Sequence, residues 1–208
     1  GEAATLVYVD DTKGWVNVQI ADDTLAGAQF ITATGGTITT SGNCKIHTFT
    51  GPGTFAVSQI ASSAPQNILS YLVVAGGGSG GVLGGGGGGA GGFREVKNPV
   101  TPYTASPRDG FSTPGNRITA TAPTSFPVVV GGGGASSPTS PTAPGNTGSN
   151  SSFSTITAAG GGFGGGNKPA GCGANGGSGG GGNGGSTPQN GGTGNTPSVT
   201  PAQGTNGG

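Results

Sequence analysis

Residues 70–95 of the chain read SYLVVAGGGSGGVLGGGGGGAGGFRE. A short apolar run, 70–75, passes directly into a tract, 76–92, in which 13 of 17 residues are glycine. Gly76, Gly78 and Gly81 also spell G-x-G-x-x-G, the glycine pattern of dinucleotide-binding loops. Either these glycines hold a phosphate, or glycine itself is the structural material.

The phosphate-binding interpretation requires a helix after the glycines, because the helix N-terminus holds the pyrophosphate. Gly81 is followed by Val82, Leu83 and six glycines, and each interior Gly costs about 0.8–1 kcal/mol of helix propensity relative to Ala. No helix is therefore expected there. Lys168 does not complete a P-loop either, since Pro169 follows it in place of Ser or Thr. We expect no nucleotide and no other cofactor.

The composition excludes further classes of function. The chain has 208 residues with 51 Gly and 15 Pro, and its seven basic and seven acidic side chains give no net charge. No basic stripe suited to nucleic acid is present, and no apolar run approaches the roughly 20 residues that cross a bilayer. The chain begins with Gly1, so we interpret it as processed or as a segment of a longer polypeptide. A disulfide between Cys44 and Cys172 is an alternative to two free thiols, which we favour.

The motif of an apolar run followed by glycine occurs three times. After the first copy, FPVVVGGGG at 126–134 and SSFSTITAAGGGFGGG at 151–166 repeat it. Helical spacing of apolar residues is absent, since Gly or Pro interrupts every window. The sequence predicts a mainly β fold with irregular polyproline II segments and essentially no helix. We expect an N-terminal β-hairpin module at 1–30, a β-meander at 31–75 with strands at 37–40, 45–50, 54–59 and 68–75, and a glycine-rich domain of short strands and polyproline II runs at 76–208.

Polyproline II is the conformation that such glycine tracts reach without strain, and it leaves every N–H and C=O free to bond to neighbouring segments. Glycine lets these backbones approach closely. Collagen is disfavoured, because the glycines are far from strict G-x-y. A disordered linker over 160–208 is the alternative. A weak signal of period three is carried by Gly173, Gly176, Gly179, Gly182 and Gly185, then Gly191 and Gly194. The glycines that we expect to form a packed structural layer are Gly76, Gly84, Gly87, Gly131, Gly161 and Gly164.

Several stretches together resemble a known family. They are GGTITTSGNCKIHTFTGPGTFAV, YLVVAGGG, GGGGAGGFRE, SFSTITAAGGGFGG and GGTGNTP. Their order resembles the glycine-rich domain of tailed-phage structural proteins, including tail fibres and other appendages of phages that infect marine cyanobacteria. TLVYVDDTKGWVNVQ resembles the β module that precedes this domain. The resemblance covers nearly the whole chain, and it implies a component of the virion surface with no enzymatic activity and no catalytic residue.

Few side chains are candidates for a site. His47, the only histidine, is interpreted as an ordinary strand residue, and the pairs Asp10-Asp11 and Asp22-Asp23 as turn residues rather than Ca²⁺ ligands. We expect no metal site. The longest loop that is not dominated by glycine, 98–127, carries aromatic and arginine side chains of the kind that dominate binding surfaces. The possible receptor-contact residues there are Tyr103, Arg108, Phe111 and Arg117, against the alternative that the loop is merely variable surface.

Three functions remain open. The leading hypothesis is a non-enzymatic virion structural protein, most naturally part of a tail fibre, that assembles with copies of itself, a homotrimer by analogy with fibres, and with other virion proteins. The second is an adhesin that contacts a host cell-surface polysaccharide or protein through the loops 98–127 and 135–150. The third is an extracellular ice-binding polyproline II protein, which the irregular glycine triplets weaken.

Overall fold

A computed structural model describes residues 6–10, 14–17, 30–137, 142–167, 171–184 and 189–208. In these ranges the chain is mainly β, as predicted, and its helical content is two short 3-10 turns. The elements are β1 (Leu6–Asp10), β2 (Gly14–Asn17), β3 (Thr32–Thr34), β4 (Thr37–Ser41), β5 (Cys44–Thr48), β6 (Gly53–Gln59), η1 (Ala64–Asn67), β7 (Tyr71–Val74), β8 (Phe93–Val96), η2 (Pro114–Asn116), β9 (Thr124–Val129), β10 (Ser151–Phe153) and β11 (Ile156–Ala158).

Three two-stranded antiparallel sheets form between strands that are consecutive in the chain. Strands β1 and β2 pair with Tyr8 opposite Trp15, which confirms the hairpin predicted near the N-terminus. Strands β4 and β5 pair across a turn in which Gly42 adopts a positive φ of 56°, a conformation that glycine reaches without steric cost. Strands β7 and β8 pair across the first glycine tract, with Val74 opposite Phe93. The ends of β7 and β8 thus fix where that tract leaves the sheet and returns to it.

The largest sheet has the strand order β11-β10-β9-β6-β3, which differs from the predicted meander. Strand β6 pairs with β9, about 70 residues later in the chain, and not with β5. The reason is apolar burial: β9 sets Phe126 opposite Phe55, whereas β5 offers the polar sequence CKIHT. Because β6 and β9 share one sheet, the boundary predicted at residue 76 runs through a continuous structure.

One hydrophobic core lies between this sheet and the β7–β8 pair. The Phe153 ring meets the rings of Phe55 and Tyr71 edge-on, at 5.9 and 5.8 Å between centroids, and lies tilted against Phe126 at 5.8 Å. The buried cluster draws on segments before and after residue 76, so these segments fold together. Its buried members are Leu69, Tyr71, Val73, Ala75, Val96, Ile118, Ile156 and Ala158.

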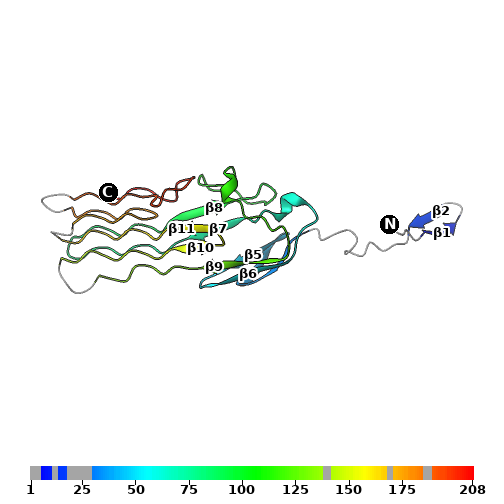
Figure 1. Cartoon of the computed structure of the whole chain (residues 1–208), viewed down its shortest axis with the longest axis horizontal. Helices are drawn as coiled ribbons and strands as arrows, with labels where there is room; N and C mark the ends of the chain where they lie inside the picture. Colours follow the sequence, from blue (N-terminus) through cyan, green and yellow to red (C-terminus); the bar gives the residue numbers. More distant parts are fainter. Residues whose placement is uncertain (1–5, 11–13, 18–29, 138–141, 168–170, 185–188) are drawn as a thin grey trace.

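The glycine-rich segments continue from the strands as a second region, which we call the glycine bundle. Strand β7 leads into 76–81, β9 into 131–134 and β11 into 160–166, which confirms the predicted motif of a strand followed by glycine. Figure 1 shows the segments running side by side as extended traces beyond the strand ends. The bundle consists of residues 76–92, 131–134, 145–149, 160–166, 171–183, 189–195 and 203–208.

Candidate functional site: the glycine bundle and the loop 98–127

Segment 160–166 is the centre of the glycine bundle, and its residues are buried apart from the half-buried Phe163. Amides three residues apart donate to the same neighbouring segment, and the amides beside them donate to a different one. A repeat of three residues is that of a polyproline II helix, which makes no hydrogen bonds within itself. The bonds are Gly161 N–H to Gly76 O, Gly164 N–H to Ser79 O, Gly162 N–H to Ser178 O and Gly165 N–H to Gly181 O, each 2.9 Å.

The same repeat extends through the rest of the bundle. Segment 160–166 accepts bonds from 86–89, 145–148 and 174–177 in addition to the donations above. In the C-terminal part, four of the glycines at the predicted period of three donate in two pairs. Gly173 and Gly176 donate to segment 189–195, and Gly179 and Gly182 donate to segment 203–208. These bonds are Gly173 to Asn190 (3.0 Å), Gly176 to Thr193 (3.1 Å), Gly179 to Thr205 (2.9 Å) and Gly182 to Gly208 (2.8 Å). The described residues of 160–208 are therefore bonded into the bundle and do not form the linker considered as an alternative.

Glycine is sterically required where the segments meet. A Cβ atom added at Gly161 would lie 2.0 Å from the carbonyl oxygen of Gly89, and one at Gly164 would lie 1.8 Å from that of Gly86. Gly76 and Gly131 are equally tight, with carbonyl oxygens 2.0 and 2.3 Å from the added atom. A real Cβ cannot approach so closely, so the bundle forms only with glycine at these four positions of the predicted layer.

The other two members of the predicted layer lie differently. A Cβ added at Gly84 or Gly87 would meet nothing within 4 Å. Gly84 adopts a positive φ of 79° at the turn between two segments, so its conformation rather than its packing favours glycine. Gly87 is exposed. These two glycines therefore face away from the packed interior.

The glycines of the G-x-G-x-x-G pattern have their amides engaged. The N–H groups of Gly76, Gly78 and Gly81 donate to carbonyl oxygens of the bundle at 3.0, 2.9 and 2.9 Å. A phosphate-binding loop needs such amides free and followed by a helix. Here the three amides are occupied, and no helix follows them in residues 82–92. The pattern is part of the bundle.

Two of the predicted contact residues in the loop 98–127 bind each other. The Nε of Arg117 donates to the carbonyl oxygen of Phe111 at 2.7 Å, and its guanidinium lies 4.4 Å from the centroid of the Phe111 ring. Phe111 in turn packs against the hydrophobic core. The Phe111–Arg117 pair thus closes the loop over the core. Arg108 is not part of this pair and lines a groove instead.

Tyr103 is placed beside two carboxylates. Its side chain is 41% exposed, and partial burial, then the negative charges of Glu95 and Asp109 and a hydrogen bond to Glu95, raise its pKa to about 12. Glu95 also accepts the amide of Ser106 at 2.9 Å, and Asp109 accepts the amides of Lys97 and Phe111, both at 3.0 Å. The carboxylates therefore fix the loop backbone, and Tyr103 lies on its surface.

Asn116 organises the interior beneath the loop, and the sequence analysis did not single it out. Its Oδ1 accepts Arg94 Nη2 at 2.7 Å, its Nδ2 donates to Thr200 O at 2.8 Å, and its main-chain oxygen accepts the Tyr71 hydroxyl at 2.6 Å. Burial raises the pKa of Tyr71 to about 12, with Arg94 opposing and Asp109 adding to the shift. A signal was available: in a chain with only 7% charged side chains, a buried charge must be satisfied largely by neutral groups such as side-chain amides.

Gln203 plays the matching role for the C-terminal segment and is 2% exposed. Its Oε1 accepts the amide of Ala159 at 2.8 Å, its Nε2 donates to Pro197 O at 2.8 Å, and its main-chain oxygen accepts the amide of Phe93 at 2.9 Å. No buried side-chain nitrogen or oxygen of the described residues lacks a hydrogen-bond partner. Polar groups inside the molecule are thus committed to holding irregular backbone.

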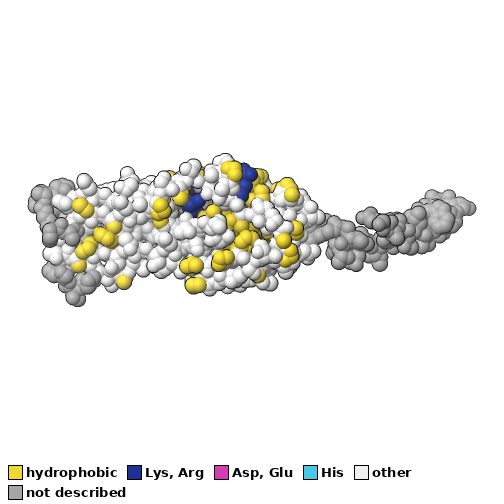
Figure 2. All heavy atoms as spheres, in the orientation of Figure 1, with side chains coloured by type: hydrophobic (Ala, Val, Ile, Leu, Met, Phe, Trp, Pro, Cys, Tyr) yellow, Lys and Arg dark blue, Asp and Glu magenta, His cyan; other side chains and the backbone are white. Residues whose placement is uncertain are grey.

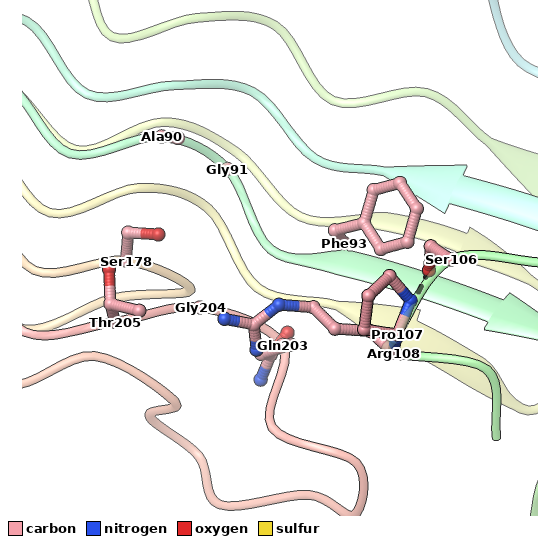
Figure 3. Close-up of a pocket in the computed structure, with 10 residues that line it drawn as sticks. All are labelled: Ala90, Gly91, Phe93, Ser106, Pro107, Arg108, Ser178, Gln203, Gly204 and Thr205. Atoms are coloured by element: carbon pink, nitrogen blue, oxygen red, sulfur yellow. Dashed lines mark hydrogen bonds between the residues drawn. The ribbon is translucent and has the colours of Figure 1, made fainter.

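An open groove of about 400 Å³ lies where the bundle meets the loop. Figure 3 shows the Phe93 ring on one side, the Arg108 side chain extending across towards Gly204, and Ser178 and Thr205 at the far end. Arg108 Nη1 donates to the carbonyl oxygen of Ala202. The residues that line the groove are Ala90, Gly91, Phe93, Ser106, Pro107, Arg108, Ser178, Gln203, Gly204 and Thr205.

The remaining candidates have local roles. His47 Nδ1 lies 2.8 Å from the carbonyl oxygen of Gly35, and its ring meets Phe55 edge-on at 4.9 Å. Cys44 and Cys172 are both free. In the parts of the chain that the structure describes, no three His, Cys, Asp or Glu side chains gather to hold a metal, and no helix is long and apolar enough to cross a membrane. Of the two Asp pairs, all but Asp10 lie outside the described residues.

The comparison with protein families returns a model described as a glycine-rich domain, matching residues 48–208. The chain belongs to the glycine-rich domain family. The match includes β6 and β7 together with the whole glycine bundle, in agreement with the sheet and the core that join them. No curated protein and no solved structure matches the chain.

Proposed function

We propose that the glycine-rich domain is a non-enzymatic structural module of a virion appendage, such as a tail fibre. The observation that carries this proposal is the bonding of segment 160–166, whose main-chain groups bind several neighbouring segments at once. Packing of this kind gives a region whose rigidity comes from backbone and not from side chains. We infer that the segments are polyproline II helices, since only that conformation combines a repeat of three with outward-facing amides.

The distribution of charge supports a structural role. After Arg117 the chain carries a single charged side chain, Lys168. On the face seen in Figure 2, Lys and Arg side chains lie over the strand-bearing half, and the described atoms of the bundle half show none. A neutral surface of this length lacks the repulsion that keeps chains apart, which supports assembly with copies of the chain, a homotrimer by analogy with fibres. The order of the sequence motifs supports the placement in a virion.

Hydrogen exchange of the full chain tests the structural part of the proposal. The amides of Gly161, Gly162, Gly164 and Gly165 are expected to exchange far more slowly than free glycine amides, because opening them requires separating the bundle. The exposed amide of Gly87 is the internal control and is expected to exchange quickly. Fast exchange at all five positions would show that the bundle does not persist in solution.

Localisation tests the virion placement separately. Purified particles are examined by electron microscopy with an antibody against the chain, and sedimentation of the isolated chain gives its oligomeric state. We expect label on an external appendage and a trimeric mass. Label confined to infected-cell lysate, with none on purified particles, would contradict the placement while leaving the rigid bundle intact.

A further inference from the structure

The groove between the bundle and the loop contains hydrogen-bonding groups that the fold does not use. Arg108 is half-buried, yet the structure gives its guanidinium one bond, to Ala202 O, out of five available N–H donors. The hydroxyls of Ser178 and Thr205 have no hydrogen-bond partner among the described residues. Elsewhere in the interior the polar side chains are satisfied, as at Asn116 and Gln203. The groove therefore brings together, in one open site, several donors that remain available to a ligand.

The positions of these groups define the chemistry of that ligand. A guanidinium matches the two oxygens of a carboxylate, and such charge-assisted pairs are about twice as strong as neutral ones. No acidic side chain lines the groove to compete for Arg108. The Phe93 ring offers an apolar face, and the two hydroxyls lie at the opposite end of the groove (Figure 3). A fitting ligand carries one carboxylate, several hydroxyls and an apolar face of C–H groups.

We propose that this groove binds an acidic saccharide of the uronic acid type. The carboxylate binds Arg108, one face of the sugar ring packs on Phe93, and ring hydroxyls bond to Ser178 and Thr205. An acidic peptide offers the carboxylate but neither the hydroxyls nor the flat C–H face, so the groove favours the sugar. This inference goes beyond the structural role proposed above, because the bundle can be rigid whether or not the groove is occupied.

The experiment uses the full chain and a ligand pair that differs only at the carboxyl groups. Trigalacturonic acid is titrated into the protein while the amide resonances of Gly91 and Gly204 are followed by NMR, and the same is done with its methyl ester. The protein variants are Arg108→Gln, which removes the charge, and Thr205→Val, which removes one hydroxyl at constant shape. Lys97→Gln is the matched control, since Lys97 also lies in this part of the chain but does not line the groove.

We expect the acid to bind and to shift both glycine amides. The methyl ester and the Arg108→Gln variant are each expected to weaken binding by about ten- to hundredfold, the range for losing a charge-assisted hydrogen bond. The Thr205→Val variant is expected to weaken binding about threefold or more, and Lys97→Gln to stay within twofold. Slow exchange of the bundle amides in every variant shows that the fold is retained.

Three outcomes would overturn the proposal. Absence of any shift at about 10 mM trigalacturonic acid, with the bundle amides still protected, excludes a uronate site. Equal binding of acid and methyl ester, or of wild type and Arg108→Gln, removes the role of the guanidinium. Binding of hexaglutamate as tightly as the saccharide would assign the groove to acidic peptides. None of these results affects the exchange test of the bundle, so the two proposals fail separately.

Discussion

Replacing Gly161 with alanine tests the packing of the bundle most directly. The added Cβ would lie 2.0 Å from the carbonyl oxygen of Gly89 and 2.8 Å from that of Ala90. Both are backbone atoms, so neither can rotate away. Segments 160–166 and 86–92 must move apart by about 1 Å or more to restore ordinary contact. Such a displacement breaks the two bonds that join these segments, from Gly89 N–H to Gly162 O and from Gly86 N–H to Gly165 O, each now 2.8 Å.

The free-energy cost follows from those two bonds. Each broken bond leaves a buried main-chain group unpaired, which costs about 1–3 kcal/mol. Gly161→Ala is therefore expected to lower the free energy of unfolding by about 2–6 kcal/mol. That is a large share of the roughly 5–15 kcal/mol that stabilises a typical domain. Trp15 lies in the N-terminal hairpin, so its fluorescence does not report on the bundle. Hydrogen exchange measured by mass spectrometry at increasing urea concentrations does report on the bundle.

Gly87→Ala is the matched control in the same glycine tract. Its Cβ meets nothing within 4 Å and its φ is not positive, so alanine fits. We expect a stability within about 0.5 kcal/mol of wild type, or a gain of up to about 1 kcal/mol because the unfolded chain loses freedom. If both variants lose stability equally, or if Gly161→Ala unfolds at the same urea concentration as wild type, the close packing described for segment 160–166 is refuted.

Three further predictions concern the polar interior. Asn116→Ala removes the nearer acceptor of the buried Arg94 guanidinium and is expected to cost about 1–3 kcal/mol; a midpoint of thermal unfolding equal to wild type would contradict this. The Tyr71 pKa of about 12 lies above the ordinary value of 10.0, so the stability that it contributes is complete below pH 10 and is lost as pH rises towards 12; titration of tyrosinate absorbance, with Tyr71→Phe as the reference, checks the sign. Gln203→Ala is expected to release residues 195–208 to protease while the core persists, and uniform cleavage along the chain would count against that local role.

Local sequence patterns predict the bundle. Each apolar run before a glycine tract, as at 70–75 and 126–130, has the composition of a strand, and each becomes one. The period of three at Gly173, Gly176, Gly179 and Gly182 corresponds to the observed bonding. Local patterns of this kind are readable because one residue type carries them.

Local sequence patterns do not predict how distant segments pair. Strand β6 bonds to β9 because Phe55 and Phe126 bury each other across some 70 residues, and no local pattern specifies that choice over β5. The groove is equally hidden, since Phe93, Arg108 and Thr205 come from three regions of the chain. Of the four predicted contact residues, the structure brings Phe111 and Arg117 together as an internal pair and leaves Arg108 in the groove.

The repeat of three along segment 160–166 constrains how the glycine tracts of this chain can change in length. Inserting one or two residues into a glycine tract rotates every following amide towards the wrong neighbour, whereas inserting three restores all of the donors to their original directions. Longer or shorter versions of the module are therefore accessible only in steps of whole triplets.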